Sequence, residues 1–232
     1  MKCSFVIPAF NAGAWIWPAV KSCLDQTHKD IEVIIVNDGS SDSTKDFLDT
    51  YSGFKDPRIK IFHTFNQGRS KARNFGNSQV TGQIICVLDA DDACHKNRAA
   101  VMVKAFKDGV QFVHGSAIEM TALGEKIKEH IAEPFNKERA SEEPYWTHIV
   151  HSSVAYTPEF ANKFPYDHEM SELGLDDWAQ QTAAYTSGVK IDHVPDVVSY
   201  YRRLSTAVSN VRDQAKVLEA KKKFIESLKV TA

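Results

Sequence analysis

The sequence predicts an α/β fold in which a mostly parallel central sheet is flanked by helices. Short runs rich in β-branched residues have strand length, and helix-like stretches separate them. These runs are largely apolar and do not alternate, which is typical of parallel strands buried on both faces. The predicted strands are Ser4–Pro8, Ile31–Val36, Arg58–His63 and Ile84–Leu88, and the helices between them are Ala19–Gln26, Ser43–Tyr51 and Ser70–Ser78.

Local signals set two of these boundaries. Trp17 precedes a proline and is therefore disfavoured in a helix, so the first helix is predicted to start near Pro18. The segment from Asn37 to Thr44 is rich in Asp, Gly and Ser, which is turn chemistry leading into a helix cap.

The second half of the chain is less regular. A charged segment, Glu125–Pro144, is expected to form an exposed excursion. The other predicted elements are a strand at Gln111–Gly115, a helix at Asp176–Ser187, a strand at Val194–Tyr201 and an amphipathic helix at Val211–Lys229, whose apolar stripe is Val211, Ala215, Leu218, Ile225 and Leu228. We expect one domain over residues 1–232, with a first half (1–110) and a second half (111–232).

Composition excludes several classes of protein. The 232 residues are 43% hydrophobic and 25% charged, which is ordinary globular composition and not that of a disordered or collagen-like chain. The net charge of −2 offers nucleic acid no overall attraction. No run approaches the roughly 20 apolar residues of a membrane span, and no segment resembles a signal peptide. Four cysteines without CxxC spacing are expected to be reduced, so a cytoplasmic location is predicted.

Polar and acidic residues follow the predicted strands, where open α/β sheets bind their ligands. Pro8–Asn11 follows the first strand and Asp38 the second, while Asp89, Asp91 and Asp92 follow the fourth. Three acids within four residues repel one another unless a cation compensates them, and their hard oxygens suit Mg²⁺ or Mn²⁺. The alternative is an Asp-rich helix cap, which needs only one of the three.

Five motifs in this order resemble the family-2 glycosyltransferases of GT-A fold. The resemblance is close over residues 3–100 and continues more weakly through Gly174–Trp178 and Tyr200–Arg202. The motifs are Phe5–Asn11, Glu32–Asp42, Asn66–Gly68, Ala72–Asn74 and Leu88–Asp92. The resemblance implies a Rossmann-like sheet with a smaller acceptor-side region.

The resemblance also implies a donor site for a nucleotide-diphosphate sugar. Asp38 would accept the ring N–H of the base, which uracil offers and cytosine does not, and Arg73 would contact the base or diphosphate. Asp91 would bind Mn²⁺ or Mg²⁺, with Asp89 beside it and near the ribose. The donor-site residues implied are Pro8, Ala9, Phe10, Asn11, Asp38, Arg73, Asp89 and Ala90. Without a ligand role, Asp38 is a turn former and Arg73 a solvated helix charge.

The family's catalytic base corresponds to Asp177. An inverting transfer needs a carboxylate that takes the proton from the attacking hydroxyl. The usual motif is Glu-Asp, so Asp176 is a conservative departure; alternatively, the pair serves the helix dipole. A second departure is Leu204, which stands where a histidine often supplies a metal ligand. Contact with the diphosphate would then fall to Arg202 or Arg203, and the possible substitute histidines are His148 and His151.

These observations predict a metal-dependent, inverting glycosyltransferase with a UDP-linked donor and a glycan, lipid-linked or other hydroxyl acceptor, which would allow peripheral membrane association. A nucleotidyltransferase would need basic residues after the first strand, and Pro8–Gly13 has none. A non-catalytic sugar-nucleotide-binding subunit would be favoured if Asp177 were missing. Aromatic side chains suited to stacking on a sugar acceptor, or to packing, are Tyr145, Trp146, Tyr156 and Tyr166.

Overall fold

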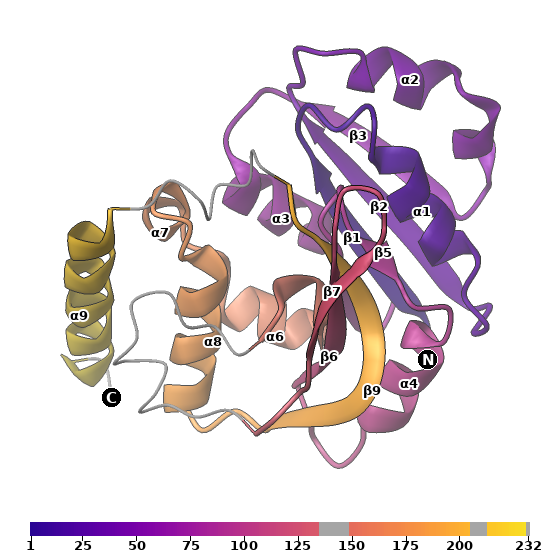
Figure 1. Cartoon of the computed structure of the whole chain (residues 1–232). Helices are drawn as coiled ribbons and strands as arrows, with labels where there is room; N and C mark the ends of the chain where they lie inside the picture. Colours follow the sequence, from indigo (N-terminus) through magenta and orange to yellow (C-terminus); the bar gives the residue numbers. More distant parts are fainter. Residues whose placement is uncertain (135–148, 205–212, 231–232) are drawn as a thin grey trace.

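The computed structural model describes residues 1–134, 149–204 and 213–230 (Figure 1). A curled nine-stranded sheet runs through this part of the chain in the order β3-β2-β1-β4-β8-β6-β9-β5, and β7 pairs with β6 outside that path. Its strands are β1 (Cys3–Ala9), β2 (Ile31–Asp38), β3 (Ile59–Thr64), β4 (Ile84–Val87), β5 (Ala93–Cys94), β6 (Phe112–Met120), β7 (Lys126–His130), β8 (Val154–Tyr156) and β9 (Ile191–Arg202).

Helices cover both faces of the sheet (Figure 1). The α-helices are α1 (Ile16–Leu24), α2 (Thr44–Thr50), α3 (Arg69–Ser78), α4 (Arg98–Ala105), α6 (Pro158–Lys163), α7 (His168–Glu172), α8 (Asp176–Thr186) and α9 (Gln214–Val230). Two short 3-10 helices are η1 (Ser52–Lys55) and η2 (His151–Ser153). None of the described helices has both the length and the apolar character needed to cross a membrane.

The first half confirms the predicted α/β fold. β1 pairs in parallel with β2 and β4, and β2 pairs in parallel with β3. Successive side chains of β1 point into opposite cores: Phe5 and Ile7 pack with α1, α2 and α4, whereas Val6 packs with α3, α6 and α8. This two-sided burial explains why the strands are continuously apolar. Helix α1 starts at Ile16, and Pro18 lies in its first turn, where no backbone donor is needed.

The second half makes the complete sheet mixed. β6 is parallel to β9, but β8 is antiparallel to both β4 and β6, and β5 is antiparallel to β9. The charged excursion predicted at Glu125–Pro144 begins as the exposed strand β7. Residues 135–148 lie outside the described part, including Tyr145, Trp146 and His148. Elements missing from the sequence prediction are β5, β7, β8, α4, α6 and α7.

The predicted stripe of the C-terminal helix is partly wrong. Val217 is buried, and Phe224 and Ile225 pack beside it against Trp178 of α8. Ala215 is exposed instead, and Val211 lies outside the described residues. The stripe shifts because α9 packs against α8 (Figure 1), and not across the broad sheet.

Candidate active site

The loop after β4 carries three carboxylates, and neighbouring elements hold it from several sides. The Ser152 hydroxyl accepts the backbone N–H of Asp89 at 3.2 Å and donates to the carboxylate of Asp92. The backbone N–H of Arg202 donates to the other Asp92 oxygen at 2.7 Å. The side chain of Arg202 donates to the backbone carbonyl of Asp91 at 2.9 Å. Asp92 is therefore buried and fixes the conformation of the loop, whereas Asp89 and Asp91 remain partly exposed and could contact a ligand.

The three carboxylates differ in charge state. Burial raises the pKa of Asp91 to about 6, and the nearby charge of Asp89 adds to the shift. Burial would also raise the pKa of Asp89, but nearby basic side chains, with Arg73 first among them, together lower that pKa to about 2. Burial and the charges of Asp91 and Asp89 raise the pKa of Asp92 well above its usual range. The negative charge of Asp91 is thus only partly compensated, because burial outweighs the nearby charges of Arg202 and Arg73.

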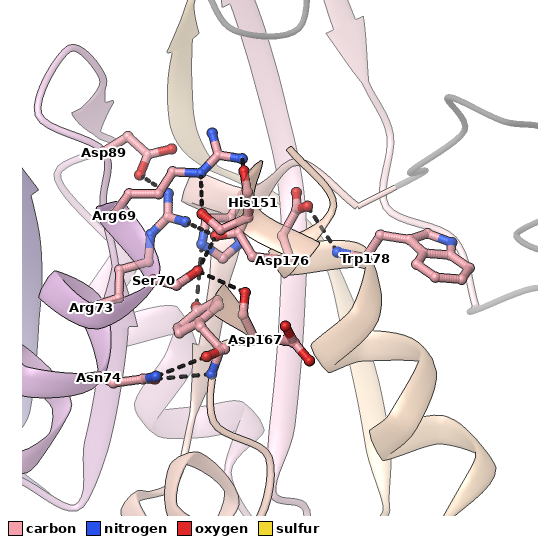
Figure 2. A network of polar contacts seen from close by, with 12 residues as sticks. Arg69, Ser70, Arg73, Asn74, Asp89, His151, Asp167, Asp176 and Trp178 are labelled. Atoms are coloured by element: carbon pink, nitrogen blue, oxygen red, sulfur yellow. Dashed lines mark hydrogen bonds and ion pairs between the residues drawn. The ribbon is translucent and has the colours of Figure 1, made fainter. Parts of the chain in front are cut away.

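Arg73 connects this loop to the second half of the chain (Figure 2). Its Nη2 donates to Asp89 Oδ1 at 2.6 Å, and its Nη1 donates to Asp176 Oδ2 at 2.5 Å. Asp176 also accepts from Arg69 Nη2 at 2.7 Å and from the Ser70 hydroxyl at 3.2 Å. All three donors lie in the first turns of α3, whereas Asp176 is the first residue of α8. Both Nη groups of Arg73 are thus taken by carboxylates, and a contact with the donor remains a prediction.

Asp176 does more than favour the dipole of its helix. Its side chain is 1% exposed and takes part in two ion pairs. The next residue, Asp177, is half-buried, and its Oδ1 accepts the backbone N–H of Trp178 at 2.8 Å. Trp178 itself is buried in the α8–α9 core. The adjacent carboxylates therefore separate into a buried one tied to α3 and an accessible one at the start of α8.

Asp38 lies at the end of β2 and holds the start of α3. Its Oδ1 accepts the backbone N–H of Gln67 at 3.0 Å, and its Oδ2 accepts that of Gly68 at 2.9 Å. A cavity of about 250 Å³ lies beside it, lined also by Thr64 and Phe75. Gly68 has a φ of 89°, which only glycine adopts without strain. The role of Asp38 toward a base remains a prediction, although the second lone pair of Oδ2 is compatible with it.

The residues at the end of β1 lie at the same edge of the sheet as Asp38, because β1 and β2 are parallel. Ala9 is buried in the core, so it offers a ligand only its backbone, whereas Phe10 is 50% exposed. The Asn11 side chain accepts the backbone N–H groups of Ser41 and Asp42, which fixes this loop to the turn after β2. Pro8 is half-buried in β1 and Ala90 is nearly buried in the acidic loop.

Several second-half expectations are revised. Tyr156 and Tyr166 are buried with their hydroxyls 3.1 Å apart, so they pack in the core and do not stack on an acceptor. The Arg202 guanidinium donates to the backbone carbonyl of Ala122 and lies over the Trp15 ring, which commits it to the fold. Arg203 keeps a side chain 61% exposed while it pairs with Glu119.

His151 lies next to the network around Arg73 (Figure 2). Its Nε2 is 3.2 Å from the Tyr166 hydroxyl, while its Nδ1 is buried without a hydrogen-bond partner among the described residues. Burial and the charge of Arg73 lower the pKa of His151, so the ring is neutral at pH 7. In the described part of the chain, no three His, Cys, Asp or Glu side chains are grouped to hold a metal. Among the described residues, His151 therefore has no group of neighbouring side chains with which it could bind a metal in place of the missing histidine at Leu204.

Sequence reasoning missed Arg69, Ser70 and Ser152. Arg69 and Arg73 are four residues apart and share one face of α3, a spacing that could have indicated a common acidic partner. Nothing local to Ser152 indicates its role, because the groups it contacts are about 60 residues away in the sequence.

We predict that Asp91→Asn stabilises the metal-free protein at pH 7. Because the folded state raises the pKa of Asp91 to about 6, ionising it opposes folding as the pH rises from about 4 through 6. The variant escapes this cost, which we place at about 1–3 kcal/mol for a half-buried group. Thermal unfolding with EDTA should show the gain at pH 7 and little at pH 4. An equal gain from Asp46→Asn, at an exposed site on α2, would contradict this explanation.

Comparisons with known proteins identify the family of this chain. The family described as Glycosyl transferase family 2 matches residues 4–163. An uncharacterized glycosyltransferase of Nostoc sp. is 29% identical over 216 residues, covering 87% of this chain and 65% of that protein. One from Rickettsia conorii is 37% identical over 128 residues, covering 55% of this chain and 21% of that protein.

Two groups of solved structures have a similar fold. S. aureus TarS in complex with UDP has a TM-score of 0.72 at 16% identity, covering 98% of this chain and 65% of that one. The mannosyltransferase PcManGT from Pyrobaculum calidifontis, in complex with GDP-Man and Mn²⁺, has a TM-score of 0.67 at 18% identity, covering 89% and 58%. This chain spans 21% to 65% of the length of these four proteins. With the family matching more than half of its residues, the chain belongs to glycosyl transferase family 2.

Proposed function

We propose that this protein is an inverting, metal-dependent glycosyltransferase that moves a sugar from a UDP-linked donor to a hydroxyl of a carbohydrate or lipid-linked acceptor. One observation supports the proposal above all: Arg73 joins Asp89 of the acidic loop to Asp176, the residue that precedes Asp177 at the start of α8. Residues 1–110 would bind the donor, and residues 111–232 would bind the acceptor.

Asp91, with Asp89 beside it, would hold Mn²⁺ or Mg²⁺. Two observations support this fit. The donors are hard carboxylate oxygens, and Asp91 forms no ion pair with a lysine, arginine or histidine of the described residues. Its pKa is raised by burial and by the charge of Asp89, and a bound cation would offset both effects. The cation would offset negative charge on the departing diphosphate. The PcManGT structure, which contains Mn²⁺, is consistent with this proposal.

Asp177 would act as the general base. The acceptor oxygen attacks the anomeric carbon, the bond from that carbon to the diphosphate oxygen breaks, and the hydroxyl proton passes to the Asp177 carboxylate. A single displacement of this kind inverts the anomeric configuration. The Trp178 N–H on Oδ1 orients the carboxylate, so that Oδ2 is the oxygen available to the proton.

Asp38 and Phe10 would recognise the nucleotide base. Asp38 has an oxygen that can accept a ring N–H, and the exposed Phe10 ring can pack against a planar base. TarS has been crystallised with UDP and with UDP-GlcNAc, which supports a uridine donor, while PcManGT binds GDP-Man.

Nucleotide binding should depend on a divalent cation through Asp91. We expect calorimetry to show UDP binding at least about tenfold more tightly with Mn²⁺ than with EDTA, because a cation held by Asp91 would offset the negative charge of the diphosphate. Asp91→Ala should remove this difference while the circular dichroism spectrum stays unchanged. Equal affinity of the wild type under both conditions would refute the metal site.

The wild type should also prefer UDP to CDP. Losing one charge-assisted hydrogen bond to Asp38 costs about 1.5–3 kcal/mol, or about 10- to 150-fold in affinity. Competition between the two diphosphates in the presence of Mn²⁺ measures this ratio directly. A ratio near one would rule out the proposed role of Asp38, whereas GDP binding would redirect the assignment to a guanosine donor.

Asp177→Asn should keep donor binding within about threefold and lower turnover by about 10²–10⁴, the usual contribution of a positioned base. The assay is release of UDP from a UDP-sugar in the presence of acceptor candidates. Release of pyrophosphate would indicate a nucleotidyltransferase, and release of neither product by the wild type would contradict a transferase. Glu172→Gln, at an exposed site before α8, is the matched control and should keep full turnover.

A further inference from the structure

We infer that Arg73 and Asp176 form a positioning pair that sets the place of the Asp177 base relative to the donor-site carboxylate Asp89. This inference rests on the proposed function and adds to it two residues that need not touch the acceptor. Three observations carry it: the geometry of the Arg73 bridge, the saturation of Asp176, and the balance of charge around them.

The Arg73 bridge is short and buried. The side chains of Arg73 and Asp176 are 6% and 1% exposed, and Asp89 is 30% exposed. A guanidinium is planar, and its two Nη groups lie at a fixed separation, so two carboxylates bound to them are held in a fixed relation. Because one carboxylate follows β4 and the other opens α8, this guanidinium holds the acidic loop and the start of α8 next to each other (Figure 2).

Asp176 has little capacity left for a substrate. Its Oδ1 accepts from Arg69, and its Oδ2 accepts from both Arg73 and Ser70. A carboxylate fixed by three donors from one helix anchors the backbone on which it sits. The next residue in sequence is Asp177, whose backbone lies in the first turn of α8. Asp176 therefore acts on the reaction through Asp177.

The charged side chains where α3, the acidic loop and α8 meet fall into two groups, those that form ion pairs with one another and those that do not. Arg69 and Arg73 pair with Asp176 and Asp89; we call these four side chains the clamp, and its two positive charges balance its two negative ones. Asp91 and Asp177 form no ion pair with any cationic side chain of the described residues. These two unpaired carboxylates are the ones assigned to the cation and to the acceptor proton. The clamp thus holds the site together without neutralising the groups that would act in it.

The test compares two substitutions at the clamp with one beside it. Arg73→Lys keeps the charge but lacks two planar donor groups at a fixed separation, and Asp176→Asn keeps the shape but removes the charge. Asn74→Ala is the matched control, because Asn74 also joins α3 to the second half through the Tyr166 backbone, at 2.8 and 2.9 Å, without touching a carboxylate. The double variant Arg73→Lys with Asp176→Asn measures whether the two act as one unit.

We expect each clamp variant to lower kcat for UDP release at least about tenfold, with the UDP affinity of Asp176→Asn in Mn²⁺ within about threefold of wild type. The kcat of the double variant should lie no more than about threefold below that of the less active single variant. If Arg73 and Asp176 act together, either substitution alone already removes their joint effect. Asn74→Ala should lower the unfolding temperature but keep kcat within about threefold. Hydrogen exchange in residues 173–181 should rise in the clamp variants and not in the control.

Additive losses in the double variant, or an equal kcat loss in Asn74→Ala, would overturn the inference and leave the proposed function standing. If Asp177→Asn kept full turnover, the base assignment would fail, and with it the idea that the clamp acts through Asp177. If the wild type released no nucleoside diphosphate, the proposed function would fail first. Hydrogen exchange would then decide on the clamp alone, and unchanged exchange in residues 173–181 would overturn it.

Discussion

The site depends on one buried guanidinium shared by two carboxylates from distant parts of the chain. Asp89 and Asp176 would repel each other and would be costly to bury without Arg73 between them. With Arg73 in place, α3 is joined to the acidic loop on one side and to α8 on the other. Without Arg73, Asp89 would lose its ion pair and Asp176 would keep only Arg69 as a cationic partner, so the network depends on this one side chain.

The acidic loop shows how one short sequence can serve three purposes. Asp92 is buried and bonds to Ser152 and to the backbone of Arg202, so it shapes the loop. Asp89 is held ionised by Arg73 and faces the junction. Burial raises the pKa of Asp91, because the charges of Arg202 and Arg73 compensate its carboxylate only in part. The helix-cap explanation of the cluster cannot account for this division, because all three carboxylates have different surroundings.

Much of the first half could be predicted from the sequence, because its strands are long, apolar and separated by helices. The positions of Asp38, Asp89 and Asp91 at strand ends followed from that pattern. The role of Asp176 did not, since it depends on contacts with residues more than 100 positions away. β5 and β8 are too short to leave a periodic signal. The stripe of α9 depended on which neighbour it packs against, and composition alone does not specify this.

The length of the Asp176 side chain has a consequence for recombining relatives within this family. The usual Glu at this position is one methylene longer, and here it would meet a fully enclosed carboxylate site whose three donors are all on α3. A chimera that takes its second half from a relative with Glu at this position would therefore place a longer side chain in a site where α3 of this chain leaves no room for it. A chimera whose crossover lies before α3 keeps α3 and α8 from the same parent, so its fold should be disturbed less than that of a chimera whose crossover lies between them.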